Sequence, residues 1–304
     1  MSWKNYSTKN SCLPSNSIQS IAIGKNNTLW LGTRDAGLVE FINYKRCIVF
    51  NKSNSQLPNN NVYVVKIDSL NNVWAGTFGG GIAKFNGRTW KIFNTGNSGI
   101  SHNWIYSIAF DKQNNVWIGT WGGGVSVFNG SSWNVYSPAN TIIPRYKVPS
   151  LLIDGKNNKW IGDLKGLLKF DGKSWIWYNQ NYNFPTISIY SLAMDQKGIL
   201  WIGFKQGGLG KFDGDSLVLF NSKNSGIPSD LVYSVTIDKN NAVWVGTFGD
   251  GVGKYSDGKW QKFNSLNSEL TDNLIFDVQV DALNNKIIGS MKGGLYFLKE
   301  RSPK

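Results

Sequence analysis

The chain has 304 residues, a formal net charge of +13, 34 glycines and an aromatic content of 14%. This length suits one large all-β domain or two smaller ones, and the many aromatic residues and glycines favour strands joined by tight turns. The sequence contains no run of eighteen apolar residues and no apolar leader at residues 1–5, so we expect no signal peptide and no direct membrane insertion.

The positive charge is spread along the chain. Lys112, Lys156, Lys197 and Lys239 fall in short turns at regular intervals. Binding to nucleic acid needs basic and aromatic residues interleaved on one face, whereas regularly spaced lysines distribute charge around the molecule. We therefore expect no nucleic-acid partner.

A motif of the form Val-Trp-Ile-Gly-Thr recurs along the whole chain. Its large residue falls at Trp30, Trp74, Trp117, Trp160, Trp201, Trp244 and, in the seventh copy, Ile287. Consecutive copies are 41 to 44 residues apart, the length that four short strands and their turns occupy in one propeller blade. The sequence therefore predicts an all-β fold, a seven-bladed β-propeller with four-stranded blades, as a single domain spanning residues 1–304.

The first predicted strand, residues 2–6, belongs to the last blade. Its sequence, Ser-Trp-Lys-Asn-Tyr, matches residues 89–93, which form the fourth strand of another unit, while the chain ends on the third strand of the seventh unit. We expect residues 1–10 to supply the missing outer strand, which closes the ring and removes an open sheet edge.

Each later unit shows the same four predicted strands in chain order, here named A (innermost) to D. In residues 228–264 they are 231–237, 242–247, 252–255 and 259–263. Strands C and D are joined by Asp257-Gly258, and by Asn-Gly or Asp-Gly in other units, which is typical of a two-residue hairpin.

The repeated tryptophans and aspartates have structural interpretations. We expect the tryptophans of strand B, together with Trp90, Trp133, Trp175 and Trp260 of strand D, to fill the space between twisted sheets. The aspartates of the A–B turn are expected to cap backbone amides; they are Asp68, Asp111, Asp154, Asp195, Asp238 and Asp281.

Residues 227–238 followed by 241–251 resemble the two-component regulator propeller repeat, and the resemblance extends along essentially the full chain. In that family the propellers form the periplasmic sensing part of bacterial hybrid histidine kinases and often respond to glycans. The resemblance therefore implies a periplasmic or extracellular location and ligand sensing or scaffolding in place of catalysis. This chain has one propeller where such sensors commonly carry two, and it lacks their immunoglobulin-like, membrane, kinase and DNA-binding regions. It is equally compatible with a free-standing secreted binder and with a piece of a larger sensor.

With strand order A to D, the D–A and B–C loops share one face of the ring, here called the loop face. The A–B and C–D turns share the other, the turn face. The loops vary between units, and variable loops on a rigid scaffold are where binding sites concentrate. Aromatic rings beside polar groups can bind sugars by stacking and hydrogen bonding. We predict a ligand site on the loop face, formed by Trp121, Phe78, Phe248, Arg34, Arg145, Tyr146 and Lys205.

An alternative remains that these rings pack against neighbouring loops. The unit of Arg145 and Tyr146 is also irregular, because Asp163 stands where four other units have Thr.

Other functions are less well supported by the residues. Seven-bladed streptogramin lyases resemble this chain in size but use two histidines, whereas the chain has only His102. Asp230, Asp250, Asp272 and Asp277 are candidates for a carboxylate pair of the glycoside-hydrolase type. A protein–protein scaffold is the main alternative to a glycan or small-molecule binder. We predict no cofactor, no metal site and no catalytic residue, and the sequence leaves open whether Cys12 and Cys47 pair.

Overall fold

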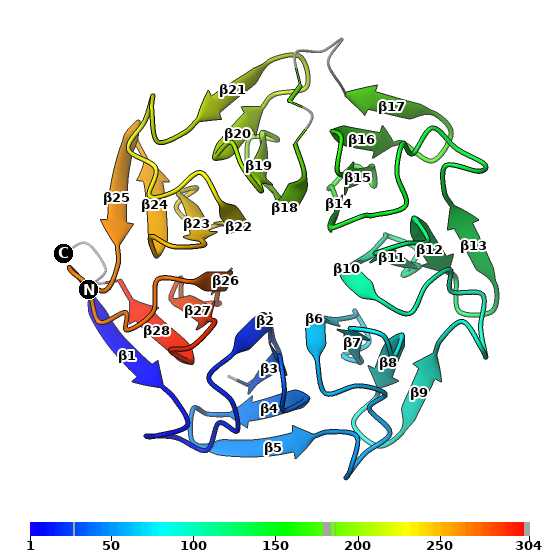
Figure 1. Cartoon of the computed structure of the whole chain (residues 1–304), viewed down its shortest axis with the longest axis horizontal. Helices are drawn as coiled ribbons and strands as arrows, with labels where there is room; N and C mark the ends of the chain where they lie inside the picture. Colours follow the sequence, from blue (N-terminus) through cyan, green and yellow to red (C-terminus); the bar gives the residue numbers. More distant parts are fainter. Residues whose placement is uncertain (27, 179–183, 186, 301–304) are drawn as a thin grey trace.

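The computed structural model describes residues 1–26, 28–178, 184–185 and 187–300. Within these residues the chain forms seven four-stranded antiparallel sheets arranged radially around a central axis, and no helix (Figure 1). The described residues accordingly include no helix that could cross a membrane. The predicted seven-bladed β-propeller is confirmed.

The strands follow the chain blade by blade, from the axis outward. Blade 1 contains β2 (Ile18–Ile23), β3 (Thr28–Thr33), β4 (Leu38–Ile42) and β5 (Arg46–Phe50); blade 2 contains β6 (Val62–Ile67), β7 (Val73–Thr77), β8 (Ile82–Phe85) and β9 (Trp90–Phe93). Blade 3 contains β10 (Ile105–Phe110), β11 (Val116–Thr120), β12 (Val125–Phe128) and β13 (Trp133–Tyr136); blade 4 contains β14 (Ser150–Ile153), β15 (Lys159–Gly162), β16 (Leu167–Phe170) and β17 (Trp175–Tyr178). Blade 5 contains β18 (Ile189–Met194), β19 (Leu200–Phe204), β20 (Leu209–Phe212) and β21 (Leu217–Phe220); blade 6 contains β22 (Val232–Ile237), β23 (Val243–Thr247), β24 (Val252–Ser256) and β25 (Lys259–Phe263). Blade 7 contains β26 (Ile275–Val280), β27 (Lys286–Ser290), β28 (Leu295–Lys299) and β1 (Ser2–Tyr6).

The N-terminal strand closes the ring as predicted. β1 pairs antiparallel with β28, in a register from Ser2↔Lys299 to Tyr6↔Leu295, and lies outside it in Figure 1. Tyr6 is buried and contacts the ring of Phe41 in blade 1 at a centroid distance of 5.4 Å. The closing strand therefore completes blade 7 and also packs against the first blade.

The predicted two-residue hairpin between strands C and D occurs in blade 6, where Asp257 and Gly258 have φ angles of 50° and 76° and connect the paired residues Ser256 and Lys259. In blades 2 to 5 the prediction is wrong: four residues connect the two strands, as between Phe85 and Trp90, and only the glycine has a positive φ. The strand-B tryptophans are buried in clusters that join neighbouring sheets. The A–B turn aspartates cap backbone amides as expected; Asp68 Oδ1, for example, accepts hydrogen bonds from the amides of Leu70 and Asn72.

A bond that the sequence analysis did not predict links these two repeated residues. In blades 2 to 6 the tryptophan indole N–H donates to the second oxygen of the turn aspartate, at 2.9–3.1 Å. Burial alone raises the pKa of the Asp68 carboxyl, but hydrogen bonds from Trp74 and Asn72 lower it below its ordinary value. The buried carboxylate thus stays ionised and holds the indole between the sheets.

The innermost strands are joined directly around the axis. Serines in strand A bond to the backbone of the next blade; the bonds are Ser20–Val65, Ser107–Val148, Ser150–Ile189, Ser191–Val235 and Ser234–Val278. At the last junction Asp277 takes the place of serine, and its Oδ2 accepts from the Ile21 amide at 2.8 Å. Within the described residues, such side-chain bonds join neighbouring blades at six of the seven junctions of the ring.

Cys12 and Cys47 form a disulfide. Cys12 follows the closing strand, and Cys47 lies in β5, the outer strand of blade 1. The bond therefore fastens the segment after β1 to the next blade.

We predict that the Cys12→Ser/Cys47→Ser variant, or reduction of the wild type, lowers the free energy of unfolding by about 4 kcal/mol. This is the loop-closure entropy for a separation of 35 residues. Urea unfolding with and without reductant measures the change. A loss under 1 kcal/mol would contradict a stabilising role, and the double variant should no longer respond to reductant.

Candidate ligand-binding site at the axial opening

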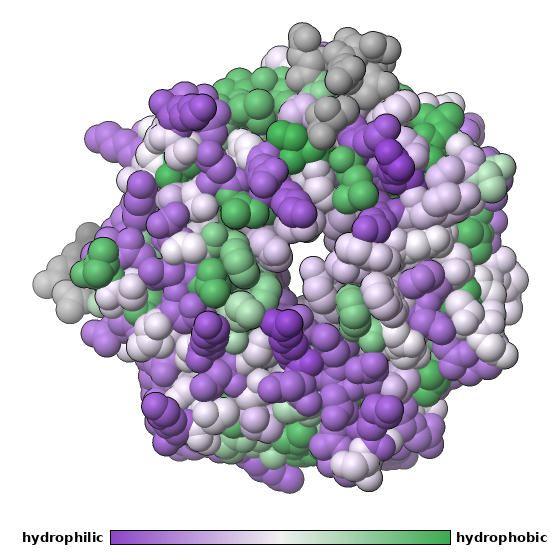
Figure 2. Space-filling view, viewed as in Figure 1, coloured by the Kyte–Doolittle hydropathy of each residue, from purple (hydrophilic) through white to green (hydrophobic). Residues whose placement is uncertain are grey.

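The second residue of strand A, or its equivalent, points towards the axis in every blade. These seven residues are Gln19, Tyr63, Tyr106, Pro149, Tyr190, Tyr233 and Phe276, and they line a cavity of about 180 Å³ at the centre of the ring. Strand A begins after the D–A loop, so these residues lie at the loop-face end of the axis. Figure 2 shows the opening through the middle of the molecule.

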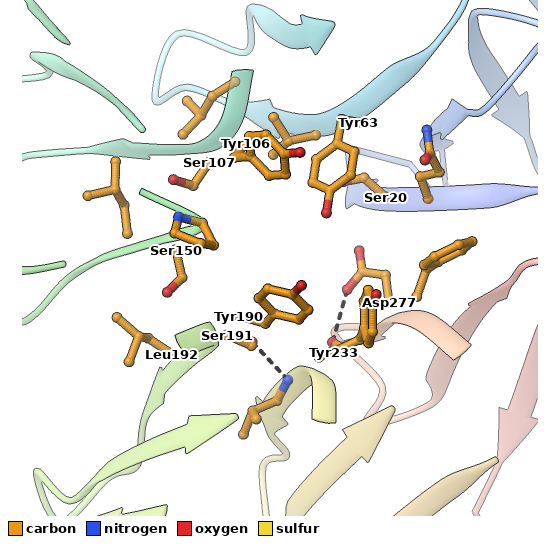
Figure 3. Close-up of a pocket in the computed structure, with 18 of the residues that line it drawn as sticks. Ser20, Tyr63, Tyr106, Ser107, Ser150, Tyr190, Ser191, Leu192, Tyr233 and Asp277 are labelled. Carbon is orange, nitrogen blue, oxygen red and sulfur yellow. Dashed lines mark hydrogen bonds between the residues drawn. The ribbon is translucent and has the colours of Figure 1, made fainter. Parts of the chain in front are cut away.

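Four tyrosines dominate this opening. Figure 3 shows the hydroxyl groups of Tyr63, Tyr106 and Tyr190 turned into the central space. The rings of Tyr63 and Tyr106 are 4.6 Å apart, and those of Tyr190 and Tyr233 are 4.9 Å apart. Burial raises the pKa of both Tyr63 and Tyr106, and the neighbouring tyrosines raise it further. The phenols are therefore neutral and can both donate and accept hydrogen bonds.

These four tyrosines are not among the residues that the sequence predicts for the site. They recur at one strand position in blades 2, 3, 5 and 6, at spacings close to the repeat length. That position faces the axis, where packing between blades does not call for an aromatic residue. The regular spacing of these tyrosines is visible in the sequence, but only the structure shows that their side chains point into a cavity.

The candidate carboxylates are held in separate local structures. Asp277 lies in strand A at the axis and is engaged by Ile21, Ser234 and Gln279. Asp230 bonds to Ser222, and Asp272 accepts from the amides of Leu274 and Lys292. Asp250 is exposed in a B–C loop. Three of the four thus already have structural hydrogen bonds.

Trp121 is in contact with neighbouring residues. Its ring stacks on Tyr106 at 4.9 Å and 22°, and Lys147 Nζ lies 3.2 Å from its centroid. Trp104 lies close by, at 6.1 Å. The ring is therefore continuous with the axial tyrosines.

Phe78 and Phe248 occupy the same loop position in blades 2 and 6. Phe78 stacks on Trp104 at 4.1 Å, and Phe248 stacks on Tyr233 at 5.2 Å. Both are partly exposed. The three predicted loop aromatics thus pack against their neighbours, as the alternative interpretation holds, and two of them extend the axial aromatic surface outward.

The predicted polar residues surround this surface. Arg34, Arg145, Tyr146 and Lys205 are all exposed, Tyr146 by 48%. Lys205 is close enough to Tyr233 to lower its pKa electrostatically, although burial raises that pKa overall. Lys205 therefore lies near one of the axial tyrosines, and none of the four predicted polar residues is among those that line the axial cavity.

Asp163 differs from its counterparts in other blades. Thr33, Thr77, Thr120 and Thr247 each donate a hydroxyl hydrogen bond to a glycine carbonyl in the B–C loop. Asp163 is fully buried; its Oδ1 accepts from the Lys165 amide, and its Oδ2 has no hydrogen-bond partner in the described part of the chain. Burial raises the pKa of this carboxyl to about 6, although Lys165 and Arg145 oppose the shift.

Comparison with protein families identifies the repeat. A family model described as "Two component regulator propeller" matches residues 12–35, 56–79, 99–122 and 226–249. These segments cover strands A and B of blades 1, 2, 3 and 6. The chain carries two-component regulator propeller repeats. The resemblance drawn from the sequence is confirmed, and comparison with curated protein sequences finds no match.

Solved structures share the architecture of this repeat propeller. The extracellular domain of the putative hybrid two component system BT3049 from B. thetaiotaomicron is 20% identical, with a TM-score of 0.83 over 99% of this chain and 42% of that one. PorZ from Porphyromonas gingivalis is 17% identical, with a TM-score of 0.79 over 96% of this chain and 48% of that one. Virginiamycin B lyase from Staphylococcus aureus is 10% identical, with a TM-score of 0.80 over 99% of each chain. At these identities the likeness establishes the fold. The chain spans less than half of the first two structures.

We predict that Asp163→Asn stabilises the propeller in a pH-dependent way. A folded-state pKa of about 6, above the ordinary 3.8, means that the native state holds this proton more tightly than the unfolded state. The wild type should therefore lose stability as pH rises from about 4 to about 6. At pH 7 the variant should be more stable by about 2–3 kcal/mol, and below pH 4 the difference should vanish. Urea unfolding across pH 4–8 measures this, and a difference independent of pH would contradict it.

Proposed function

We propose that this propeller is a non-catalytic ligand-binding module of a sensing or binding protein, and that it binds a saccharide at the axial opening of the loop face. The observation that carries the proposal is the convergence of tyrosines from four blades on one cavity, with the hydroxyls of Tyr63, Tyr106 and Tyr190 turned into its centre. Neutral phenols supply donors and acceptors that match sugar hydroxyls, and ring faces match the apolar faces of sugars.

The surrounding residues fit this chemistry. Gln19, Lys66 and Gln279 add polar groups to the cavity wall. Phe248 and Trp121 continue the aromatic surface from Tyr233 and Tyr106 onto the loops. Arg34, Arg145, Tyr146 and Lys205 can then contact the outer part of a longer ligand.

A catalytic role has less support. His102 Nδ1 accepts a hydrogen bond from the Trp104 amide, which commits one ring nitrogen to loop structure. The described residues contain no cluster of metal-ligating side chains. We therefore favour binding over a lyase or hydrolase activity, and a protein scaffold is the main alternative.

The proposed location is periplasmic or extracellular. The disulfide between Cys12 and Cys47 supports it, because such bonds persist mainly in oxidising compartments. The similar B. thetaiotaomicron structure is an extracellular domain. Sensing in that compartment is consistent with a saccharide ligand.

The test is a glycan-array screen at low and high salt, followed by titration of the tightest-binding neutral oligosaccharide against hydroxyl-deletion variants. Tyr63→Phe and Tyr190→Phe keep the rings and remove one hydrogen-bonding group each, so each should weaken binding by about three- to tenfold. Tyr255→Phe, between blades 5 and 6 and away from the axis, is the matched control.

Unchanged affinity in both axial variants would place the ligand elsewhere. An array without binding at either salt concentration would reject the saccharide proposal and favour a protein partner, to be sought by pull-down from the native source.

A further inference from the structure

The first residue of the B–C loop makes the same backbone contact in two of the blades. In blades 2 and 6 this residue forms an isolated β-bridge with the residue that precedes strand A in the next blade. The pairs are Phe78 with Trp104 and Phe248 with Leu274. In both blades the residue paired with the loop aromatic is therefore apolar, and in blade 2 the two rings stack at 4.1 Å.

Blade 3 departs from this pattern. The corresponding residue beside Trp121 is Lys147, whose Nζ lies 3.2 Å from the ring centroid. The Tyr106 ring stacks on Trp121 at 4.9 Å. At these distances one ring face cannot hold both groups, so the ammonium and the tyrosine occupy opposite faces of the indole.

The backbone around Lys147 is fixed. The Tyr146 carbonyl accepts from the Gly124 amide at 2.9 Å, and the Val148 amide donates to the Thr120 carbonyl at 2.9 Å. Only the long, flexible side chain of Lys147 is thus free to leave the ring. Lys147 takes part in none of the ion pairs among the described residues.

We propose that Lys147 is a removable cap on Trp121, which keeps this ring face covered until a ligand displaces the ammonium. This inference rests on the proposed saccharide site and describes how a ligand gains access to one face of the Trp121 ring. A cation–π contact at a partly exposed site is weak, and an ammonium regains full hydration when it swings into water. Trp104 and Leu274, by contrast, would expose apolar surface if they moved. Trp121 is therefore the loop aromatic that side-chain motion alone can uncover.

The first arm of the test needs no saccharide. Solvent exposure of the Trp121 indole is measured by NMR as paramagnetic relaxation from dissolved TEMPOL, with the resonance assigned by Trp121→Phe. Lys147→Ala should raise this relaxation at least twofold, and Lys147→Arg should restore it towards the wild-type value. Lys169→Ala is the control, because Lys169 lies over Trp160, which is buried between blades. Equal relaxation in the wild type and Lys147→Ala would overturn the cap.

The second arm uses the tightest-binding neutral oligosaccharide from the array. If the ligand must displace the ammonium, Lys147→Ala should bind it about two- to fivefold more tightly than the wild type. In a Trp121→Ala background the same change should have no effect. If Lys147→Ala binds the oligosaccharide more weakly than the wild type, Lys147 contacts the ligand directly and the proposal is overturned. A failed array would reject the saccharide site, while the relaxation arm would still decide whether Lys147 covers the ring.

Discussion

Closure of the ring by β1 is the constraint on which the rest of the molecule depends. A blade of four strands buries its faces only against its two neighbours, so an open end would expose a whole sheet. The pairing of β1 with β28 completes the seventh blade, and the Cys12–Cys47 bond holds the adjoining segment on the first. Asp277 joins the same two blades at the axis. Three separate contacts thus secure the junction between the chain ends.

A closed ring also fixes the geometry of the axial opening. Residues from the start of strand A in all seven blades line the cavity, so it forms only where the blades meet around the axis. The serine-to-backbone bonds between neighbouring strands A lie directly beside these residues. The hydroxyls of Tyr63 and Tyr190 are thereby positioned by rigid strands, and the more variable loops add Trp121 and Phe248 around them. Rigid strands therefore supply the centre of the site and loops supply its edge.

Much of this architecture could be predicted from the sequence, because it repeats. The spacing of the Trp-Ile-Gly-Thr motif gave the number of blades, and the match of residues 2–6 to 89–93 gave the closure. The direction in which each side chain points cannot be predicted from the spacing of a motif. The pairing of the cysteines and the axial tyrosines depend on how neighbouring blades face one another, and the Trp–Asp bond depends on how the A–B turn folds back on strand B within one blade. The predicted loop aromatics lie on the loop face, but their packing on Tyr106, Trp104 and Tyr233 is visible only in the structure.

The central claim is that the axial opening of the loop face is the binding surface. Hydrogen-exchange mass spectrometry, with and without the tightest-binding neutral oligosaccharide, tests it most directly. If the ligand binds there, added protection is confined to peptides covering the starts of strands A, such as 103–108, 187–192 and 231–235, and the adjoining B–C loops. Protection confined to the A–B and C–D turns would contradict it, because those segments lie on the opposite face of the ring.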